Sequence, residues 1–349
     1  MRRGQRPAGG PATLVQVAQA ARVSPSTVSR ILNGTARVTE KKRRAVEAVI
    51  ARLGFHPNPM ARGLRQGRRM TIGIVALSVE SPFFGAIFRG IADALAGSEF
   101  APLILSGSPD PAEEAQRIAL LLSRRVDGVI AVTCRVPDEQ LIRLAGTAPI
   151  VVCGRALCHG KVFGIKLDNV LAGLLAVRHL IGLGHRRILH LEGPPDHLDA
   201  AERLEGYRRA LDEARVPFDP ALVVRAGFYS EDGLGAVGRV LDTRRRFSAI
   251  FAANDECAYG ARLGLFQRGL RVPEDVSLVG VDDLPVSRYT TPPLTTVRQP
   301  LEDVGRRAVG SLLDLLHGRY PSTAGIPQVE LVIRGTTAPQ GQAAFPHAR

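Results

Sequence analysis

No stretch of the sequence approaches the roughly 18 consecutive apolar residues that a membrane-spanning helix needs. The first residues, MRRGQRPAGGPA, are basic but contain no apolar segment of the kind that marks a secretory signal. We therefore expect a disordered basic arm at 1–12, a cytoplasmic protein and no membrane partner.

The sequence also lacks cysteines paired at the spacing of metal sites. The four cysteines form no CxxC motif, the spacing typical of zinc sites. Cys153, Cys158 and His159 lie close in sequence, but free thiols are the ordinary state of cysteines in a cytoplasmic protein. We expect no metal ion at these residues.

The chain has no glycine-rich phosphate loop and no recognisable nucleophile–base pair. GLGH at 182–185 and AVGRV at 236–240 both lack the GxGxxG fingerprint. These absences argue against an enzyme on a nucleotide-binding fold, so we expect no catalytic residues and no cofactor.

Acidic residues are scarce in the first 69 positions, where 15 Lys and Arg residues stand against only Glu40 and Glu47. The net charge of this segment equals the +13 of the whole chain, so the rest of the chain is neutral overall. A solvated surface normally mixes both signs, whereas a block of one sign is typical of a surface that binds phosphates. The charge distribution favours double-stranded DNA as a partner.

The basic segment contains TLVQVAQAARVSPSTVSRILNG at 13–34, which is predicted to form two short helices joined by a tight turn. Apolar residues recur from Leu14 at the i, i+3, i+4 and i+7 positions of one helical face. Ser24 and Pro25 supply an N-cap and a first helical residue, and Val28 begins the apolar side of the second helix. The polar residues left on its outer surface and first turns are Ser26, Thr27, Ser29 and Arg30. Such side chains can reach bases and phosphates in a major groove; an ordinary helical hairpin is the alternative, and the charge argues against it.

A third helix is predicted to begin after its N-cap Thr39 and to end at Gly54. The next segment could start a short helix at Asn58, but Gly63 weakens it, and a helix of about two turns is marginal in water. We expect this segment to be ordered only when something else holds it.

From Met70 onwards, short aliphatic strands alternate with helical patterns. Strands are predicted at 71–77, 101–106, 126–132, 149–154, 187–193, 247–253, 276–282 and 329–337, and helices at 113–124, 204–214 and 301–317. Near-continuous apolar strands joined by helical crossovers are typical of parallel sheets covered on both faces. The predicted fold is a small all-α headpiece followed by an α/β core of two doubly wound parallel sheets.

Several ordered motifs make the chain resemble the LacI/GalR (lactose/galactose repressor) family of transcription factors over almost its full length. They are VAQAARVSPSTVSRILNG, NPMARGLRQGR, SPFF, GHRRI, RLEGY, AAND, GVDD, PPLTTVRQP and RGTTAP. The resemblance implies a helix–turn–helix headpiece, a hinge helix and a two-lobed core like a periplasmic sugar-binding protein.

The patterns and the resemblance together predict the domain boundaries. After the arm at 1–12 we expect a DNA-binding domain at 13–57, a hinge at 58–69, a core at 70–340 and a tail at 341–349. The core is expected to have one lobe of about 70–168 plus 300–327 and a second lobe of about 169–298 plus 329–340.

The resemblance also assigns DNA contacts. It places Pro25 and Ser26 at the base-reading start of the recognition helix, and Leu64 where a leucine wedges between base pairs in the minor groove. Leu14 and Asn33 are expected in packing or on the phosphate side, and Gly63 departs from the more usual serine. The full set of expected DNA-contacting residues is Leu14, Ser24, Pro25, Ser26, Thr27, Ser29, Arg30, Asn33, Asn58, Ala61 and Leu64.

A ligand site is expected where side chains follow the predicted strands, because doubly wound sheets bind ligands at the carboxyl ends of their strands. The expected residues are Phe83, Phe84, Arg155, Arg203, Asn254, Asp255 and Asp282. Aromatic, Arg, Asn and Asp side chains suit a polyol such as a sugar. Each alone could instead cap a helix, shape a turn or be solvated. Many relatives have an acidic residue just before the position of Arg155, where this chain has Cys153 and Gly154.

We therefore interpret the chain as a homodimeric transcriptional repressor that binds a pseudo-palindromic operator and responds to a small-molecule effector, expected to be a sugar. A single headpiece implies a dimer, because a palindrome needs two. The alternatives are a sugar-binding protein of the transport type and a regulator that responds to a nucleoside or purine.

Overall fold

The computed structural model describes residues 12–32, 38–55, 69–243, 245–322 and 328–341. The chain divides into two compact units, Met1–Met70 and Thr71–Arg349. Almost all of the predicted hinge, with Asn58, Ala61 and Leu64, lies outside the described residues, as does Asn33. No helix in the described ranges has the length and apolar character that crossing a membrane requires.

The described part of the first unit, residues 12–32, 38–55 and 69–70, contains three helices. They are α1 (Leu14–Ala20), α2 (Pro25–Leu32) and α3 (Glu40–Leu53). Val17, Val28 and Val46 are fully buried between them and form the centre of a small core. The predicted helix–turn–helix and the third helix are both confirmed.

Local hydrogen bonds explain where these helices begin. The Thr13 hydroxyl accepts a bond from the backbone N–H of Gln16, whose side chain accepts one from the backbone N–H of Thr13, which is a capping box. The Ser24 hydroxyl accepts a bond from the backbone N–H of Thr27 at 3.2 Å, as expected of the N-cap of α2. At the end of α3, Gly54 adopts a φ of 59°, which favours glycine.

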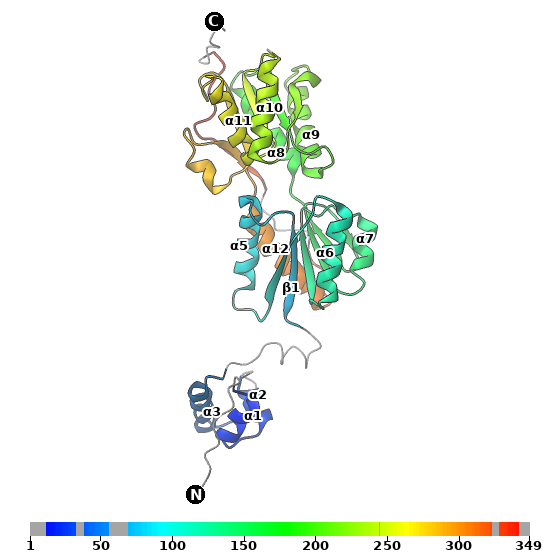
Figure 1. Cartoon of the computed structure of the whole chain (residues 1–349), viewed down its shortest axis with the longest axis vertical. Helices are drawn as coiled ribbons and strands as arrows, with labels where there is room; N and C mark the ends of the chain where they lie inside the picture. The colour runs from blue at the N-terminus through cyan, green and yellow to red at the C-terminus, as the bar shows by residue number, and fades with distance from the viewer. Residues whose placement is uncertain (1–11, 33–37, 56–68, 244, 323–327, 342–349) are drawn as a thin grey trace. The chain divides into compact units, whose positions relative to one another are not determined.

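The second unit consists of two lobes, each built on a six-stranded sheet (Figure 1). The chain forms, in order, β1 (Thr71–Ala76), α5 (Pro82–Leu95), β2 (Ala101–Ser106), α6 (Pro111–Ser123), β3 (Gly128–Val132), α7 (Asp138–Leu144), β4 (Ile150–Cys153), β5 (Cys158–His159) and β6 (Val162–Ile165) in the first lobe. In the second lobe it forms α8 (Asn169–Gly182), β7 (Ile188–Glu192), α9 (Leu198–Glu213), β8 (Val223–Arg225), α10 (Ser230–Asp242), β9 (Ala249–Ala252), α11 (Asp255–Gln267), β10 (Ser277–Asp282) and β11 (Thr295–Arg298). It then returns to the first lobe as α12 (Leu301–Leu316) and ends in the second as β12 (Glu330–Val332).

The strand order is β2-β1-β3-β4-β6-β5 in the first sheet and β12-β11-β10-β9-β7-β8 in the second. All pairings are parallel except those of the edge strands β5 and β12, which are antiparallel. The two-lobed, doubly wound fold is confirmed, with mixed rather than purely parallel sheets. The short strands β5, β6, β8 and β11 were not predicted.

Helices cover both faces of each sheet. In the first lobe, Ile72 and Ile74 pack towards α5 and α12, while Val75 packs towards α6 on the other face. Figure 1 shows α5 and α12 on one side of β1 and α6 and α7 on the other. In the second lobe, α8 and α9 cover one face, and α10 and α11 the other. Because both faces are buried, the central strands are mostly apolar, which explains why the sequence pattern predicted them.

Paired glycines allow helices to cross at very short range. A Cβ on Gly90 of α5 would lie 1.9 Å from the Glu302 carbonyl oxygen of α12, and a Cβ on Gly305 of α12 would lie 2.2 Å from the Ile87 carbonyl oxygen. Gly173 of α8 has the same relation to α9, and Gly233 of α10 to α11. In each of these helix pairs the backbones of the two helices are therefore in direct contact.

We expect Gly90→Ala to lower the free energy of unfolding by about 3 kcal/mol or more, because its methyl group would force α5 away from α12. Gly85→Ala is the matched control, since a Cβ at Gly85 on the same helix meets nothing within 4 Å. We expect that change to stabilise by about 0.5–1 kcal/mol. Urea unfolding measures the change in the free energy of unfolding for each variant. Similar changes in the two variants would contradict the close contact of α5 with α12 at Gly90.

His190 provides a pH-dependent contribution to stability. Its ring is stacked between Tyr207 and Phe251, with centroid distances of 5.4 and 4.7 Å, and its Nδ1 lies 3.0 Å from the Phe251 carbonyl oxygen. Burial lowers the pKa of His190 to about 4. The unfolded chain therefore binds a proton below pH 6.5 that the folded chain excludes until about pH 4, so stability falls as the pH falls through this window.

We expect acidification from pH 7 to pH 4.5 to cost the wild type about 2 kcal/mol more than the variant His190→Phe, which cannot titrate. Urea unfolding at the two pH values provides the comparison. An equal loss in both proteins would show that His190 is not held neutral.

Candidate functional site

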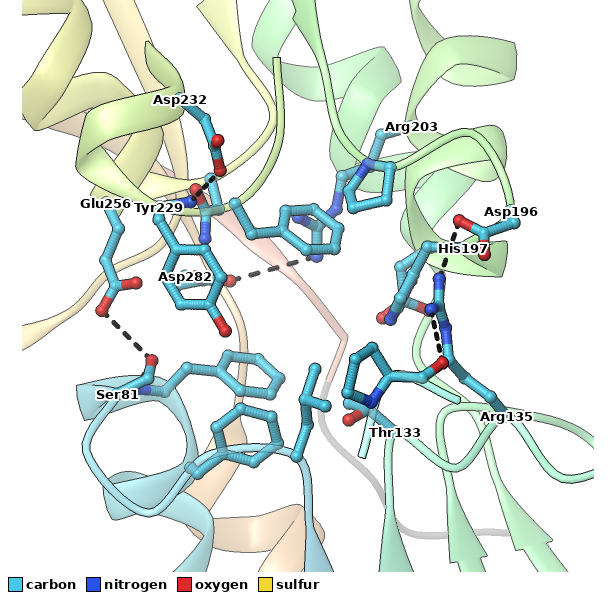
Figure 2. A pocket seen from close by; sticks show the side chains of 18 residues that line it. Ser81, Thr133, Arg135, Asp196, His197, Arg203, Tyr229, Asp232, Glu256 and Asp282 are labelled. Atoms are coloured by element: carbon cyan, nitrogen blue, oxygen red, sulfur yellow. Dashed lines mark hydrogen bonds and ion pairs between the residues drawn. The ribbon is translucent and has the colours of Figure 1, made fainter. Parts of the chain in front are cut away.

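A cavity of about 470 Å³ lies between the two lobes of the second unit, and side chains from both lobes line it (Figure 2). The first lobe contributes Ser81, Phe83, Phe84, Thr133 and Arg135, among others, and the second lobe contributes Asp196, His197, Asp199, Arg203, Phe228, Tyr229, Asp232, Asn254, Glu256 and Asp282. We call it the interlobe cavity. Its volume is in the range of small-molecule sites, about 300–1,000 Å³.

The parallel sheets place these side chains together. Phe83 lies in the first turn of α5 after β1, Arg203 lies on α9 after β7, and Asp282 is the last residue of β10. The carboxyl ends of parallel strands meet at one edge of each sheet, and here these edges of the two lobes face each other across the cavity. Five of the seven predicted ligand residues line it, namely Phe83, Phe84, Arg203, Asn254 and Asp282.

Aromatic rings form an apolar part of the wall. Phe83 and Phe84 meet edge to face with centroids 5.2 Å apart, and His197 meets Phe228 in the same way at 5.0 Å. The guanidinium of Arg203 lies 5.9 Å from the centre of the Phe228 ring. Such surfaces can stack on the C–H face of a sugar or on a planar base.

Arg203 is the buried polar centre of the second lobe's wall and is 3% exposed. Its Nε donates to the Asn169 side-chain oxygen at 2.9 Å, and its Nη1 donates to the Ala253 carbonyl at 2.5 Å. Its Nη2 lies 4.0 Å from the carboxylate of Asp282. The guanidinium is therefore fixed in orientation by three different elements.

Asp282 is also buried, and Oδ1 accepts a hydrogen bond from the side chain of Gln299 at 2.8 Å. Burial raises the pKa of Asp282 well above its usual range, and the charge of Arg203 opposes that shift. Its φ of 126° is a strained value for a residue other than glycine. The neighbouring carboxylate of Asp283 fixes this turn, because it accepts hydrogen bonds from Arg298 at 2.7 Å and Arg334 at 2.5 Å.

Asp255, one of the predicted ligand residues, does not line the interlobe cavity. It is fully buried and accepts hydrogen bonds from the backbone N–H of Leu284 and the hydroxyls of Ser287 and Thr296, at 2.9, 2.6 and 2.5 Å. Burial raises the pKa of Asp255 to about 7. The side chain therefore holds the turn that presents Asp282.

Arg155 does not line the interlobe cavity either. Its guanidinium donates to the carbonyls of Cys134 and Val136 and to the carboxylate of Asp138. It borders an adjacent polar chamber of about 210 Å³ that shares several lining residues with the interlobe cavity. Asn254 does line the cavity, but its side-chain oxygen also caps α11 by accepting from the backbone N–H of Cys257 at 2.9 Å.

Two polar links join the lobes on opposite sides of the cavity (Figure 2). The Ser81 hydroxyl donates to Glu256 at 3.1 Å, and Arg135 forms an ion pair with Asp196 at 2.8 Å. None of these four residues was predicted, because the linked partners lie far apart in sequence. Tyr229 was not predicted either, because the sequence pattern did not indicate β8, the strand that precedes it.

The other candidate surface is α2 of the first unit. Ser24, Pro25, Ser26 and Arg30 are exposed there, and Thr27 and Ser29 are half-buried. The Ser24 hydroxyl lies 2.8 Å from the hydroxyls of both Ser26 and Thr27. Leu14 is half-buried and packs against the small core.

Comparison with known proteins agrees with both a helix–turn–helix unit and a two-lobed core. Residues 13–58 match the family of bacterial regulatory proteins of the lacI type, and residues 177–337 match a periplasmic binding protein-like domain. The transcriptional repressor PurR of Proteus mirabilis is 34% identical over 87% of this chain and 90% of its own length. The transcriptional repressor CytR of Escherichia coli K12 is 32% identical over 93% of this chain and 96% of its own length.

Solved structures give the same result. The lac repressor dimer bound to operator and an anti-inducer superposes with a TM-score of 0.82 at 28% identity, covering 94% of this chain and all of that one. A complex of the regulator CelR with cellobiose gives a TM-score of 0.68 at 32% identity, covering 93% and 99%. The resemblance inferred from the motifs is thus confirmed, and the chain belongs to the lacI family of bacterial regulatory proteins as a DNA-binding transcriptional regulator.

Proposed function

We propose that this regulator represses transcription from a pseudo-palindromic operator in the cytoplasm, and that a sugar bound in the interlobe cavity changes its affinity for that operator. The observation that carries the proposal is a cavity walled by both lobes of a chain whose first unit is a basic helix–turn–helix. We propose the boundaries 13–57, 58–69 and 70–340 for the DNA-binding domain, hinge and core. Relatives solved with cellobiose and with ribose support a sugar. The aromatic walls also fit a nucleoside, which is the second candidate.

A ligand in this position can act on both lobes at once. It touches side chains that belong to the same surfaces as the links Ser81–Glu256 and Arg135–Asp196. Its binding energy therefore differs between arrangements of the lobes that keep these links and arrangements that break them. Such a difference is what allows a ligand to shift a conformational equilibrium.

The test begins with selection of an operator from a random DNA duplex library. A gel-shift titration of that operator should show a log–log salt slope of several units, because the basic unit displaces counterions from phosphates. A thermal-shift panel of sugars and nucleosides should then find a compound that also changes operator affinity. Failure to select any operator would refute the DNA-binding part, and a cavity ligand without effect on operator affinity would refute the coupling.

A homodimer is part of the proposal, and an exposed apolar surface on the second lobe suits it. Phe266 and Leu263 of α11 are 76% and 47% exposed, and Tyr289 after the 3-10 turn Pro285–Arg288 is 83% exposed. Phe266 and Leu263 border a shallow groove, whose other lining residues are Tyr259, Arg262 and Thr290. Large clustered apolar side chains of this kind mark interaction surfaces.

We expect Phe266→Glu to convert the dimer to monomer and to weaken operator binding by at least about tenfold, because a charge would be buried at the contact. Gln267→Glu adds the same charge one position along the exposed side of α11 and serves as the control. Analytical ultracentrifugation and gel shifts measure both effects. A dimeric Phe266→Glu variant would place the interface elsewhere.

A further inference from the structure

The charged residues of the interlobe cavity are mostly acidic. Five carboxylates line it, from Asp196, Asp199, Asp232, Glu256 and Asp282. The cationic side chains of the lining are those of Arg135 and Arg203. Burial lowers the pKa of His197, which disfavours a positive charge on this side chain. The wall therefore carries more negative than positive charge.

Both guanidiniums already have partners. Arg203 is held by Asn169 and the Ala253 carbonyl and lies 4.0 Å from Asp282. Arg135 forms its ion pair with Asp196 and donates to the Pro109 carbonyl at 3.1 Å. An anionic ligand that reached either guanidinium would also meet the carboxylate beside it, Asp282 at Arg203 and Asp196 at Arg135.

The carboxylates, in contrast, keep acceptor capacity. Each ionised carboxylate has about four lone-pair sites. Glu256 accepts one hydrogen bond from Ser81, and Asp232 accepts one from the backbone N–H of Tyr229 at 3.0 Å. Burial raises the pKa of Glu256, and the hydrogen bond from Ser81 opposes this shift only in part. Nδ1 of His197 has no hydrogen-bond partner among the described residues.

Resting on the proposed function, we infer that the effector is an unphosphorylated molecule rich in hydrogen-bond donors, and that the cavity excludes its phosphate esters. Hydroxyl or amino groups of such a ligand donate to Glu256 and Asp232, while its apolar face lies against Phe83 and Phe228. A phosphate would bring about two negative charges into a wall that already has an excess of carboxylates, and such like-charge contacts cost several kcal/mol.

The inference is tested with matched pairs of compounds. Ribose, glucose, cellobiose, adenosine and cytidine are compared with ribose 5-phosphate, glucose 6-phosphate, cellobiose phosphate, AMP and CMP by thermal shift and calorimetry on the full chain. We expect binding within the unphosphorylated set and affinity at least about a hundredfold weaker for the phosphate ester of any compound that binds. A phosphate ester that binds as tightly as its parent, or a panel without any unphosphorylated binder, overturns the inference.

A double variant distinguishes exclusion of the phosphate by charge from exclusion by the shape of the cavity. Asp232→Asn combined with Glu256→Gln removes two negative charges at nearly constant volume. We expect this double variant to reduce the ratio of the affinities for a binder and for its phosphate ester about tenfold or more. Glu213→Gln, on the exposed side of α9 away from the cavity lining, is the control and should leave the ratio unchanged. An unchanged ratio in the double variant would show that shape rather than charge excludes the phosphate. Operator binding without ligand is measured in parallel, so failure of the DNA-binding proposal is seen separately.

Discussion

Replacing Arg30 by alanine is expected to weaken binding to the selected operator about a thousandfold, while non-specific binding to other DNA falls far less. Arg30 is exposed near the end of α2, the helix proposed to enter the major groove. A lost base contact costs about 1–3 kcal/mol, and a dimer on a palindrome loses it twice. Gel shifts with operator and with scrambled DNA at one salt concentration measure both losses.

Arg44→Ala is the matched control for Arg30→Ala. Arg44 is exposed on α3 and pairs with Glu40 at 3.2 Å, so its loss removes the same charge from the same unit outside the recognition helix. We expect less than about a tenfold loss of operator affinity in this variant. Calorimetry should show the effector affinity of both variants unchanged, because the cavity lies wholly in the second unit. Equal losses on operator and scrambled DNA for Arg30→Ala would contradict a base-reading role.

The second large effect is expected from Arg203→Ala, which should lower effector affinity at least about a hundredfold, since hydrogen bonds to charged groups contribute about 1.5–3 kcal/mol each. The change also leaves the Ala253 carbonyl and the buried Asp282 without the guanidinium. Removing one member of a buried charged pair costs about 3–5 kcal/mol, so the free energy of unfolding should fall as well. Calorimetry and urea unfolding measure the two losses.

Asp282→Asn tests for a loss of effector affinity in a variant that is expected to remain folded. Asparagine has the same shape, accepts the bond from Gln299 and tolerates the positive φ better than most residues, so this variant should remain folded. We expect a clear loss of effector affinity with operator binding preserved in the absence of ligand. If both Arg203→Ala and Asp282→Asn bind the effector as the wild type does, the ligand lies outside the interlobe cavity.

The elements that sequence predicted well are those fixed by local patterns. The headpiece helices depend on caps such as Ser24 and on apolar spacing within a few turns. The central strands are buried on both faces, which makes their sequences mostly apolar. Strands of two to four residues, such as β5 and β8, carry too few side chains to form a pattern, so the residues that follow β8 could not be found.

The candidate site was predicted only in part, for a related reason. A position after a strand indicates the correct edge of the sheet but not the direction of the side chain. Asp255 follows β9 and Asp282 ends β10, yet Asp255 points into the turn after β10 and Asp282 into the cavity. The links between Ser81 and Glu256 and between Arg135 and Asp196 join residues of different lobes, and no local pattern records such pairs.

The chain passes between the lobes three times, and this has a consequence for synthesis. The first lobe has all its strands by residue 165, but α12, which covers Ile72, Ile74 and their neighbours, ends only at Leu316. The second lobe receives its edge strand β12 at Glu330–Val332. A chain emerging from the ribosome therefore keeps an apolar face of its first lobe open for about 150 residues of elongation, and such exposed apolar surface is prone to aggregation. Both lobes are completed almost together at the very end, so any truncation before α12 should yield insoluble protein rather than one folded lobe.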